Sequence, residues 1–239
     1  MKECTILIVL FGTILTANCQ STQETTNNAG YPDMPEELLL KALFQKYNKN
    51  ARPATVLMPV VTVDHGMDLI RINSFKDNTL RTDVWERMTW HDPRLVWNPS
   101  NYFGLTSLSI TPDMVWTPDV TLYNGVGEIQ KADLFRRITV NSNGMLLWLF
   151  PAQLESACVY KKKNGKYDCR LKFASWTYNG LQLNLTHTDR QLGMSNFYPN
   201  PDYEIVGTNS TLNLMRYACC PEPYPDVSYQ LSFKGVGKG

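Results

Sequence analysis

The chain has 239 residues, a formal net charge of +1 at pH 7 and only three histidines. The near-zero charge and the lack of an arginine-rich run argue against nucleic-acid binding. His65, His91 and His187 lack metal-ligand spacing, and the sequence has no nucleophile elbow, P-loop or zinc-protease motif. We therefore expect neither an enzyme, nor a metal site, nor a cofactor.

The first 19 residues predict a secretory signal peptide. Lys2 supplies a positive start, Thr5 to Leu15 an apolar centre, and Ala17-Asn18-Cys19 a small-x-small cleavage site. The alternative is an N-terminal membrane anchor, but the apolar run is short for a span. No later stretch approaches 18 apolar residues, so we expect a secreted chain without a membrane span.

The polar residues 20–32 are expected to be a flexible lead-in to a single domain over 33–239. A helix should open this domain. Asp33 can cap it, and Glu36 completes a capping box. The residues of its apolar face are Leu39, Leu40, Leu43 and Tyr47, and Arg52-Pro53 is expected to end it.

Alternating strand patterns follow between turn signals, which predicts an all-β sandwich. Turns are expected at Asp77-Asn78, Asn143-Gly144 and Asn179-Gly180. The expected inward-facing residues are Leu80, Val84, Met88 and Trp90 in one strand, Leu181, Leu183 and Leu185 in another, and Val227, Tyr229, Leu231 and Phe233 in a third.

Trp85 stands on the opposite, polar face of the strand of 80–90. It shares that face with Arg81, Asp83, Arg87 and Thr89. A tryptophan in this position is either covered by a loop of its own chain or contacts a ligand or another subunit.

Four cysteines remain once the predicted signal is removed. Cys158, Cys169, Cys219 and Cys220 allow three disulfide connectivities, and their spacing favours Cys158–Cys169 and Cys219–Cys220. An even number of cysteines is typical of a secreted protein.

Three further features fit the same compartment or a solvated surface. Asn184-Leu-Thr and Asn209-Ser-Thr are potential N-glycosylation sites. The basic stretch KKKNGK at 161–166 lies inside the small disulfide loop and is expected to be a solvated turn with Asn164-Gly165 at its tip.

The adjacent Cys219 and Cys220 need a different role from an ordinary staple. Their Cα atoms are about 3.8 Å apart across a trans peptide, below the usual disulfide range of roughly 4.4–6.8 Å. A bond between them stabilises the fold little and is expected to stiffen a turn between Tyr217 and Tyr224. Free thiols, or half of a metal site, are the disfavoured alternatives in a secreted chain without a nearby histidine.

Five aromatic residues lie near strand ends or turns: Trp85, Tyr123, Trp176, Tyr217 and Tyr224. Singly, such residues usually belong to a core. Together they predict an aromatic box, whose ring faces attract a cation with about 2 kcal/mol when the contact is desolvated.

The motifs TWHDPRLVWNPSNY, VWTPDVTLYN, RLKFASWTY and YACCPEPYPDV occur in this order. With them the chain resembles, from about residue 33 to 234, the extracellular domain of nicotinic acetylcholine receptors and most closely the soluble acetylcholine-binding proteins. The resemblance implies an N-terminal helix and an immunoglobulin-like, ten-stranded β-sandwich. It also implies a homopentamer with ligand sites between subunits.

The resemblance also implies a role for each site residue. One subunit would supply a principal face of Tyr123, Trp176, Tyr217, Tyr224 and the Cys219–Cys220 disulfide. The next subunit would supply a complementary face of Trp85, Arg87, Leu147, Leu149 and, on the preceding strand, Thr139. Asp119, Lys172 and Ser175 would support the principal face from behind.

Two departures from the receptor pattern shape the functional expectation. The loop CVYKKKNGKYDC is polar where receptors carry Phe-Pro-Phe-Asp, and the sequence ends before any membrane helix. Both favour a secreted binding protein for acetylcholine, nicotine and related cations over the extracellular domain of a channel. A second alternative is an orphan binding protein with another cationic ligand. At the position of Arg87, many relatives have a neutral side chain. Arg87 either weakens small agonists, or points to water, or pairs with an acid.

Two other protein classes are disfavoured. An immunoglobulin-like adhesion domain would need a long-range inter-sheet disulfide, and a hydrolase would need a catalytic constellation.

Overall fold

The computed structural model describes residues 34–127, 130–131, 136–158 and 165–236. The predicted signal peptide, the lead-in and the capping residue Asp33 lie outside these residues, as does most of the basic turn. The residues from Pro35 onward form one unit.

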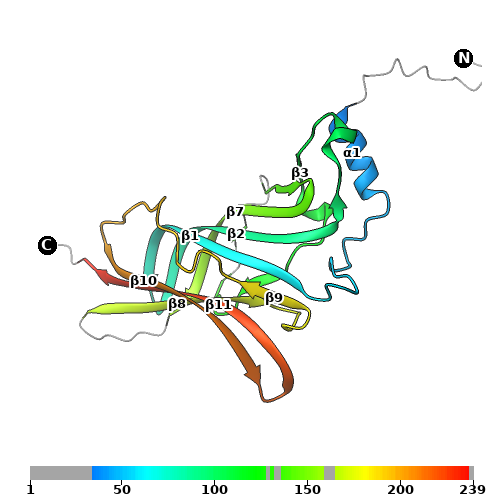
Figure 1. Cartoon of the computed structure of the whole chain (residues 1–239). Coiled ribbons are helices and arrows are strands. Elements are labelled where there is room, and N and C mark those ends of the chain that lie inside the picture. Colours follow the sequence, from blue (N-terminus) through cyan, green and yellow to red (C-terminus); the bar gives the residue numbers. More distant parts are fainter. Residues whose placement is uncertain (1–33, 128–129, 132–135, 159–164, 237–239) are drawn as a thin grey trace, which may run out of the picture. The chain divides into compact units, whose positions relative to one another are not determined.

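Two β-sheets make up most of this unit (Figure 1). A seven-stranded sheet has the order β3-β6-β7-β2-β1-β9, with β5 paired to β7, and a four-stranded sheet has the order β10-β11-β8-β4. The elements are α1 (Pro35–Phe44), β1 (Val61–Lys76), β2 (Thr79–Val96), η1 (Pro99–Tyr102), β3 (Ser107–Ile110), η2 (Pro112–Met114), β4 (Val120–Leu122), β5 (Gln130–Lys131), β6 (Ile138–Asn141), β7 (Asn143–Ala157), β8 (Lys166–Ser175), β9 (Leu183–Thr186), β10 (Tyr203–Tyr217) and β11 (Cys220–Gly235).

The predicted β-sandwich with an N-terminal helix is confirmed. The described part of the chain has eleven strands where the resemblance implied ten, and one of them, β5, is only two residues long.

Helix α1 buries Leu39 completely but is shorter than the sequence predicted. It ends at Phe44, well before Arg52-Pro53. Tyr47 explains the early end, because its hydroxyl donates a hydrogen bond to Asp92 Oδ2 at 2.6 Å and thereby ties the chain to the sheet.

Arg94 completes this early end of α1. Its guanidinium donates to the backbone carbonyl oxygens of Asn48 and Ala51, each at 3.1 Å. Carbonyls that accept from a distant side chain no longer need a helix to satisfy them.

The alternation of the two long strands is confirmed. Leu80, Val84, Met88 and Trp90 are at most 2% exposed, and the four predicted residues of 227–233 are completely buried. These two strands belong to different sheets, and their inward faces build the core between them.

The prediction for Leu181 was wrong. Leu183 and Leu185 are buried in β9, but Leu181 is 60% exposed. The Asn179 carbonyl accepts hydrogen bonds from the N–H groups of Gln182 and Leu183, so a turn holds Leu181 and the strand begins two residues later.

The predicted turns at the ends of β1 and β6 are confirmed by backbone geometry. Asp77 and Asn78 have φ of 51° and 58°, and Gly144 has φ of 81°. Asp77 and Asn78 are the two residues between β1 and β2, and left-handed conformations are the ones that a two-residue hairpin loop requires. Gly144 is the second residue of β7, directly after the turn at Ser142.

The three histidines have structural partners. His65 is completely buried, and its Nδ1 lies 2.9 Å from the hydroxyl of Tyr229. His187 Nε2 lies 2.8 Å from Ser210 Oγ, and His91 Nε2 lies 3.1 Å from the carbonyl oxygen of Asn143.

The described residues contain neither a metal-binding cluster nor a membrane-spanning helix. No group of three or more His, Cys, Asp or Glu side chains there could hold a metal ion. No helix in the same part of the chain is both long and apolar enough to cross a membrane.

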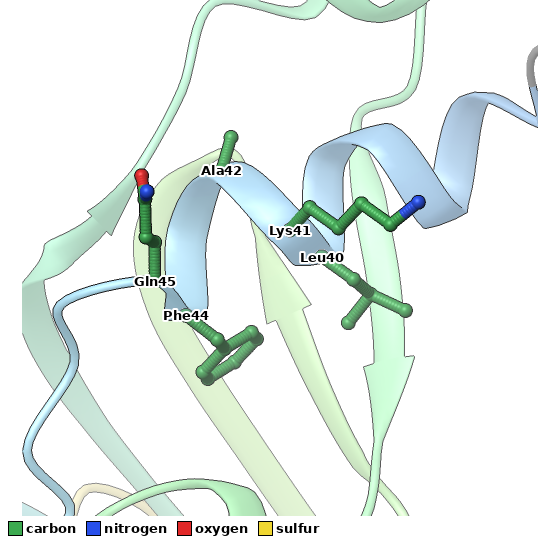
Figure 2. Close-up of a pocket in the computed structure, with 5 residues that line it drawn as sticks. All are labelled: Leu40, Lys41, Ala42, Phe44 and Gln45. Carbon is green, nitrogen blue, oxygen red and sulfur yellow. The ribbon is translucent and has the colours of Figure 1, made fainter. Parts of the chain in front are cut away.

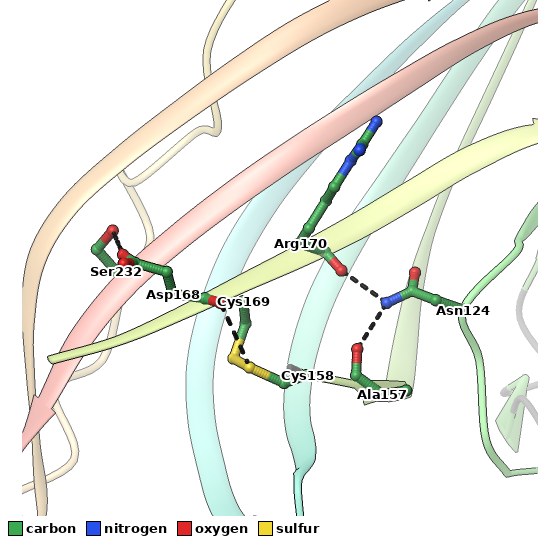
Figure 3. The surroundings of a disulfide bond; sticks show 7 residues. All are labelled: Asn124, Ala157, Cys158, Asp168, Cys169, Arg170 and Ser232. Atoms are coloured by element: carbon green, nitrogen blue, oxygen red, sulfur yellow. Dashed lines mark hydrogen bonds between the residues drawn. A yellow bond between two sulfur atoms is a disulfide. The ribbon is translucent and has the colours of Figure 1, made fainter. Parts of the chain in front are cut away.

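The disulfide Cys158–Cys169 joins the end of β7 to β8, with its Cα atoms 4.9 Å apart (Figure 3). Asn124 reinforces this junction, because its Nδ2 donates to the carbonyl oxygens of Ala157 at 2.9 Å and Arg170 at 2.7 Å. The disulfide and Asn124 therefore fix the strand that leads into Ser175 and Trp176.

Candidate ligand-binding site

Tyr123 and Trp176 form an aromatic pair where two neighbouring strands end. Tyr123 follows β4 and Trp176 follows β8. Their ring centroids are 5.7 Å apart with planes at 76°, an edge-to-face arrangement. The Tyr123 hydroxyl donates to the Ser175 carbonyl oxygen at 2.5 Å, while the Trp176 side chain is 73% exposed.

Asp119 braces the loop that carries Trp176. Its carboxylate accepts hydrogen bonds from Ser175 Oγ at 2.5 Å and from the Thr177 N–H at 2.7 Å. The Asp119 carbonyl oxygen also accepts from the Trp176 N–H at 3.3 Å. Charge-assisted hydrogen bonds to the residues on both sides of Trp176 hold the backbone that carries its exposed ring.

Lys172 places an ammonium group beside this aromatic pair. Its Nζ lies 5.5 Å from the centroid of the Tyr123 ring and 3.3 Å from Asp226 Oδ2. Asp226 is 1% exposed, and its Oδ1 accepts from Asn213 Nδ2 at 2.7 Å and from Ser228 Oγ at 2.8 Å. Lys172 therefore shares this buried carboxylate with Arg170, whose Nη2 lies 3.4 Å from Asp226 Oδ1.

The surroundings raise the pKa of Tyr123 above its ordinary value. Burial is the main cause, followed by the ionisable groups of Tyr217, Asp119, Tyr224 and Asp226. At physiological pH the phenol therefore remains neutral and keeps its hydrogen bond to the Ser175 carbonyl.

The hairpin of β10 and β11 carries the second aromatic pair. Tyr217 pairs with Cys220 across the turn, and the Tyr217 and Tyr224 rings are 5.3 Å apart at 67°. The structure joins Cys219 to Cys220 by a disulfide with its Cα atoms 3.8 Å apart. The tip of the hairpin is thus a short covalent ring next to two tyrosines.

The predicted complementary residues lie on the other sheet. Arg87 of β2 stands opposite Leu149 of β7, and Leu147 of β7 stands opposite Thr139 of β6. Trp85 is 38% exposed and Leu149 is 51% exposed. We call Trp85, Leu147 and Leu149 the apolar wall.

Arg87 does not point away into water. Its Nη2 lies 3.7 Å from Asp64 Oδ2 and donates a hydrogen bond to Asp189. The structure shows the pairing with acids, and the effect of Arg87 on small agonists remains a prediction.

The two potential glycosylation asparagines differ in exposure. Asn209 is exposed on β10, an edge strand of its sheet, whereas Asn184 is half-buried in β9. Glycosylation of either remains a prediction.

A depression of about 650 Å³ on α1 lies apart from these predicted residues (Figure 2). Its lining residues are Leu40, Lys41, Ala42, Phe44 and Gln45. Lys41 is its only charged group and is paired with Glu37 at 2.7 Å, so the depression offers no free charge for a ligand.

The sequence matches a known protein family. The model of the neurotransmitter-gated ion-channel ligand binding domain matches residues 36–234. The chain belongs to this family. It is a family of ligand-binding domains and not of enzymes.

The similar curated proteins include two receptor subunits of Homo sapiens. Neuronal acetylcholine receptor subunit alpha-4 is 33% identical over 234 residues, which cover 93% of this chain and 35% of the subunit. Subunit alpha-2 is 33% identical over 205 residues, which cover 81% of this chain and 38% of the subunit. The chain thus spans little more than a third of either subunit.

A solved structure shows the same fold. AChBP of Capitella teleta, in complex with lobeline, superposes with a TM-score of 0.78 at 23% sequence identity. The match covers 86% of this chain and 100% of that chain.

The acids that hold the two basic residues are not apparent from the sequence. Asp226, the partner of Lys172, lies 54 residues further along the chain, and Asp189 lies 102 residues after Arg87. No local pattern marks such pairs. Gly66, opposite Arg87, is the one local sign of this arrangement, because an isolated glycine inside a strand pattern indicates that another group approaches the backbone closely.

Proposed function

We propose that the chain binds acetylcholine-like cations, with a quaternary or protonated amine held against Tyr123, Trp176, Tyr217 and Tyr224. The single observation that carries the proposal is the edge-to-face pair of Tyr123 and Trp176, in which a braced tryptophan remains 73% exposed. The face of an aromatic ring attracts a cation, and the desolvated contact contributes about 2 kcal/mol.

Each supporting residue has a distinct part in this proposal. Asp119 and the Tyr123 hydroxyl hold the backbone on both sides of Trp176. The Cys219–Cys220 disulfide stiffens the hairpin that closes over the ligand. A stiff hairpin lowers the entropy lost on binding, because fewer conformations must be given up.

The site is proposed to be completed by a second copy of the chain. One aromatic pair directly follows β4 and β8, and the other lies on β10 and β11. The apolar wall belongs to β2 and β7 of the other sheet. Both surfaces expose apolar side chains that water disfavours. We propose a homopentamer in which the apolar wall and Thr139 of one copy cover the aromatic pairs of the next.

Secretion is part of the same proposal. Cys158, Cys169, Cys219 and Cys220 are all in disulfides, which persist in oxidising compartments. The polar loop CVYKKKNGKYDC favours a binding protein that is not coupled to a channel.

The alternative is the extracellular portion of a ligand-gated channel. It is favoured by the similarity to the alpha-4 and alpha-2 receptor subunits, of which the chain covers only part. Both alternatives place the same cation in the same site.

Calorimetric titration of the purified protein with acetylcholine and nicotine tests the proposal. Saturable binding is expected, and Trp176→Ala should weaken it at least about 30-fold, the equivalent of about 2 kcal/mol. Tyr198→Ala removes an aromatic residue of similar exposure, 67%, outside the site and should leave binding unchanged. Equal affinities of wild type and Trp176→Ala would contradict the proposal.

A further inference from the structure

We propose that Arg87 is a positioning residue. It clamps the segment 186–189 beside the apolar wall, and it acts on ligand binding through this segment and not by contact with the ligand. The inference rests on the proposed function. The family resemblance placed Arg87 on the complementary face, and the inference gives it a positioning role there and adds Asp64 and Asp189 to the site.

Asp64 begins the clamp where the sheet ends. β1 and β9 run parallel, and Asp64 pairs with Thr186 at the last position of their ladder. Asp64 Oδ1 then accepts hydrogen bonds from Thr186 Oγ1 at 3.0 Å, Thr188 Oγ1 at 2.7 Å and the Thr188 N–H at 2.8 Å. Beyond the end of the β1–β9 ladder, this carboxylate oxygen therefore supplies the hydrogen-bond acceptor that a neighbouring strand would otherwise provide.

Arg87 extends the clamp to Asp189, which no other side chain described here holds. Its Nη2 bonds Asp189 and lies 3.7 Å from Asp64 Oδ2. His187 is fixed separately, because its Nδ1 lies 3.0 Å from the carbonyl oxygen of His65. Loss of Arg87 should therefore release the end of the segment more than its start.

Gly66 shows that the fold accommodates the path of the Arg87 side chain. The two residues are opposite each other in the β1–β2 pairing. A Cβ at position 66 would lie 2.6 Å from Arg87 Nη2 and 3.0 Å from Cζ. The guanidinium therefore lies across the bare backbone of the neighbouring strand, where any other residue would displace it.

The position of Arg87 links the segment to the apolar wall. Arg87 shares its strand face with Trp85, two residues earlier, and stands opposite Leu149. A movement of the segment that pulls on Arg87 therefore acts on the strand face that carries the wall.

The charges of the clamp also suit a cationic ligand. Hydrogen bonds from Thr188 and Thr186 and the charge of Arg87 outweigh the effect of burial and lower the pKa of Asp64. One guanidinium between two carboxylates, those of Asp64 and Asp189, carries a net charge of −1. The clamp as a whole therefore does not repel a cation.

Removal of Arg87 gives opposite results under the two possible roles. If Arg87 acts only by its charge, Arg87→Ala removes a repulsive cation and tightens the binding of acetylcholine. If Arg87 acts by position, the same variant frees the segment and weakens binding. The sign of the change therefore separates the two roles.

The experiment uses the full chain with Arg87→Ala, Asp189→Asn, the double variant and the charge-swapped Arg87→Asp/Asp189→Arg. The control is Arg81→Ala, which removes another arginine of the same strand that pairs with Glu155 at 2.9 Å. Two quantities are measured. One is the hydrogen exchange of the backbone N–H groups of 188–190 without ligand, and the other is the dissociation rate of acetylcholine.

The clamp predicts faster exchange and about fivefold faster dissociation in each single variant, since a partly exposed ion pair contributes up to about 1 kcal/mol. The double variant should be no worse than either single one, the charge swap should recover part of the loss, and Arg81→Ala should behave as wild type.

Tighter binding by Arg87→Ala, or unchanged exchange in it, overturns the clamp. If the wild-type chain binds neither acetylcholine nor nicotine, the proposed function fails. Hydrogen exchange in the free protein then still decides whether Arg87 holds the segment.

Discussion

Gly180 donates its backbone N–H to the carbonyl oxygen of Pro223 at 2.7 Å. Gly180 closes the loop that carries Trp176, and Pro223 lies on β11 next to Tyr224. This bond connects the loop of the first aromatic pair, Tyr123 and Trp176, to the hairpin of the second, Tyr217 and Tyr224. A Cβ at position 180 would lie 3.0 Å from the same carbonyl oxygen and 3.1 Å from Pro225 Cδ.

Gly180→Ala should therefore push the Trp176 loop away from the hairpin. We expect a loss of about 1–3 kcal/mol in the free energy of unfolding, the usual effect of overpacking, and weaker binding of acetylcholine. Gly207→Ala is the matched control, because nothing lies within 4 Å of a Cβ there. Denaturant unfolding and calorimetric titration measure the two effects, and equal behaviour of the two variants would count against the bond.

The two disulfides should have opposite effects on stability and binding. Removal of Cys158–Cys169 opens a loop with a sequence separation of 11 and should cost about 3 kcal/mol of stability. Removal of Cys219–Cys220, with a separation of 1, should leave stability nearly unchanged and weaken ligand binding. Paired Cys→Ser variants in denaturant unfolding and titration test this, and a large stability loss from the second pair would contradict it.

Asp119→Ala should weaken binding although Asp119 is not expected to touch the ligand. Its carboxylate loses the bonds from Ser175 and Thr177, and hydrogen bonds to a charged group contribute about 1.5–3 kcal/mol each. We expect at least about 2 kcal/mol of lost stability and a changed emission of Trp176. Glu204→Ala removes an exposed acid and should stay within about 0.5 kcal/mol of wild type. Unchanged affinity in Asp119→Ala would show that the brace is not needed.

The raised pKa of Tyr123 predicts a one-sided pH dependence. Burial, then Tyr217, Asp119, Tyr224 and Asp226, favour the neutral phenol in the folded state. Its contribution to stability is therefore complete below the unfolded value near about 10 and disappears as the pH rises through the folded pKa. The difference in phenolate absorbance between wild type and Tyr123→Phe should appear only above about pH 10, and its appearance below that pH would refute the expectation.

The sequence predicted what depends on local periodicity. The buried face of Leu80, Val84, Met88 and Trp90 follows from a period of two, and the exposure of Trp85 follows from the same count. The predicted burial of Leu181 was wrong because a turn precedes the strand. In this turn the Asn179 carbonyl accepts hydrogen bonds from two backbone N–H groups, which no count of alternating residues reveals.

The family resemblance located the aromatic residues but not the acids behind them. Lys172 with Asp226 and Arg87 with Asp189 meet only after the sheets have formed. Because each pair joins segments far apart in the chain, its partner cannot be read from spacing. Arg87 shows the consequence, since its effect on a cation depends on carboxylates that the strand itself does not contain.

Complementation between two defective variants tests the central claim, a site shared by two copies of the chain, most directly. Trp176→Ala and Trp85→Ala should each bind acetylcholine poorly when produced alone, because each lacks one half of every site. Co-expressed, they form mixed rings in which some interfaces join an intact Trp176 to an intact Trp85, and saturable binding at wild-type affinity should return at that fraction of sites. Full binding by Trp85→Ala alone, or none in mixed rings shown by native mass spectrometry to contain both variants, would contradict the account.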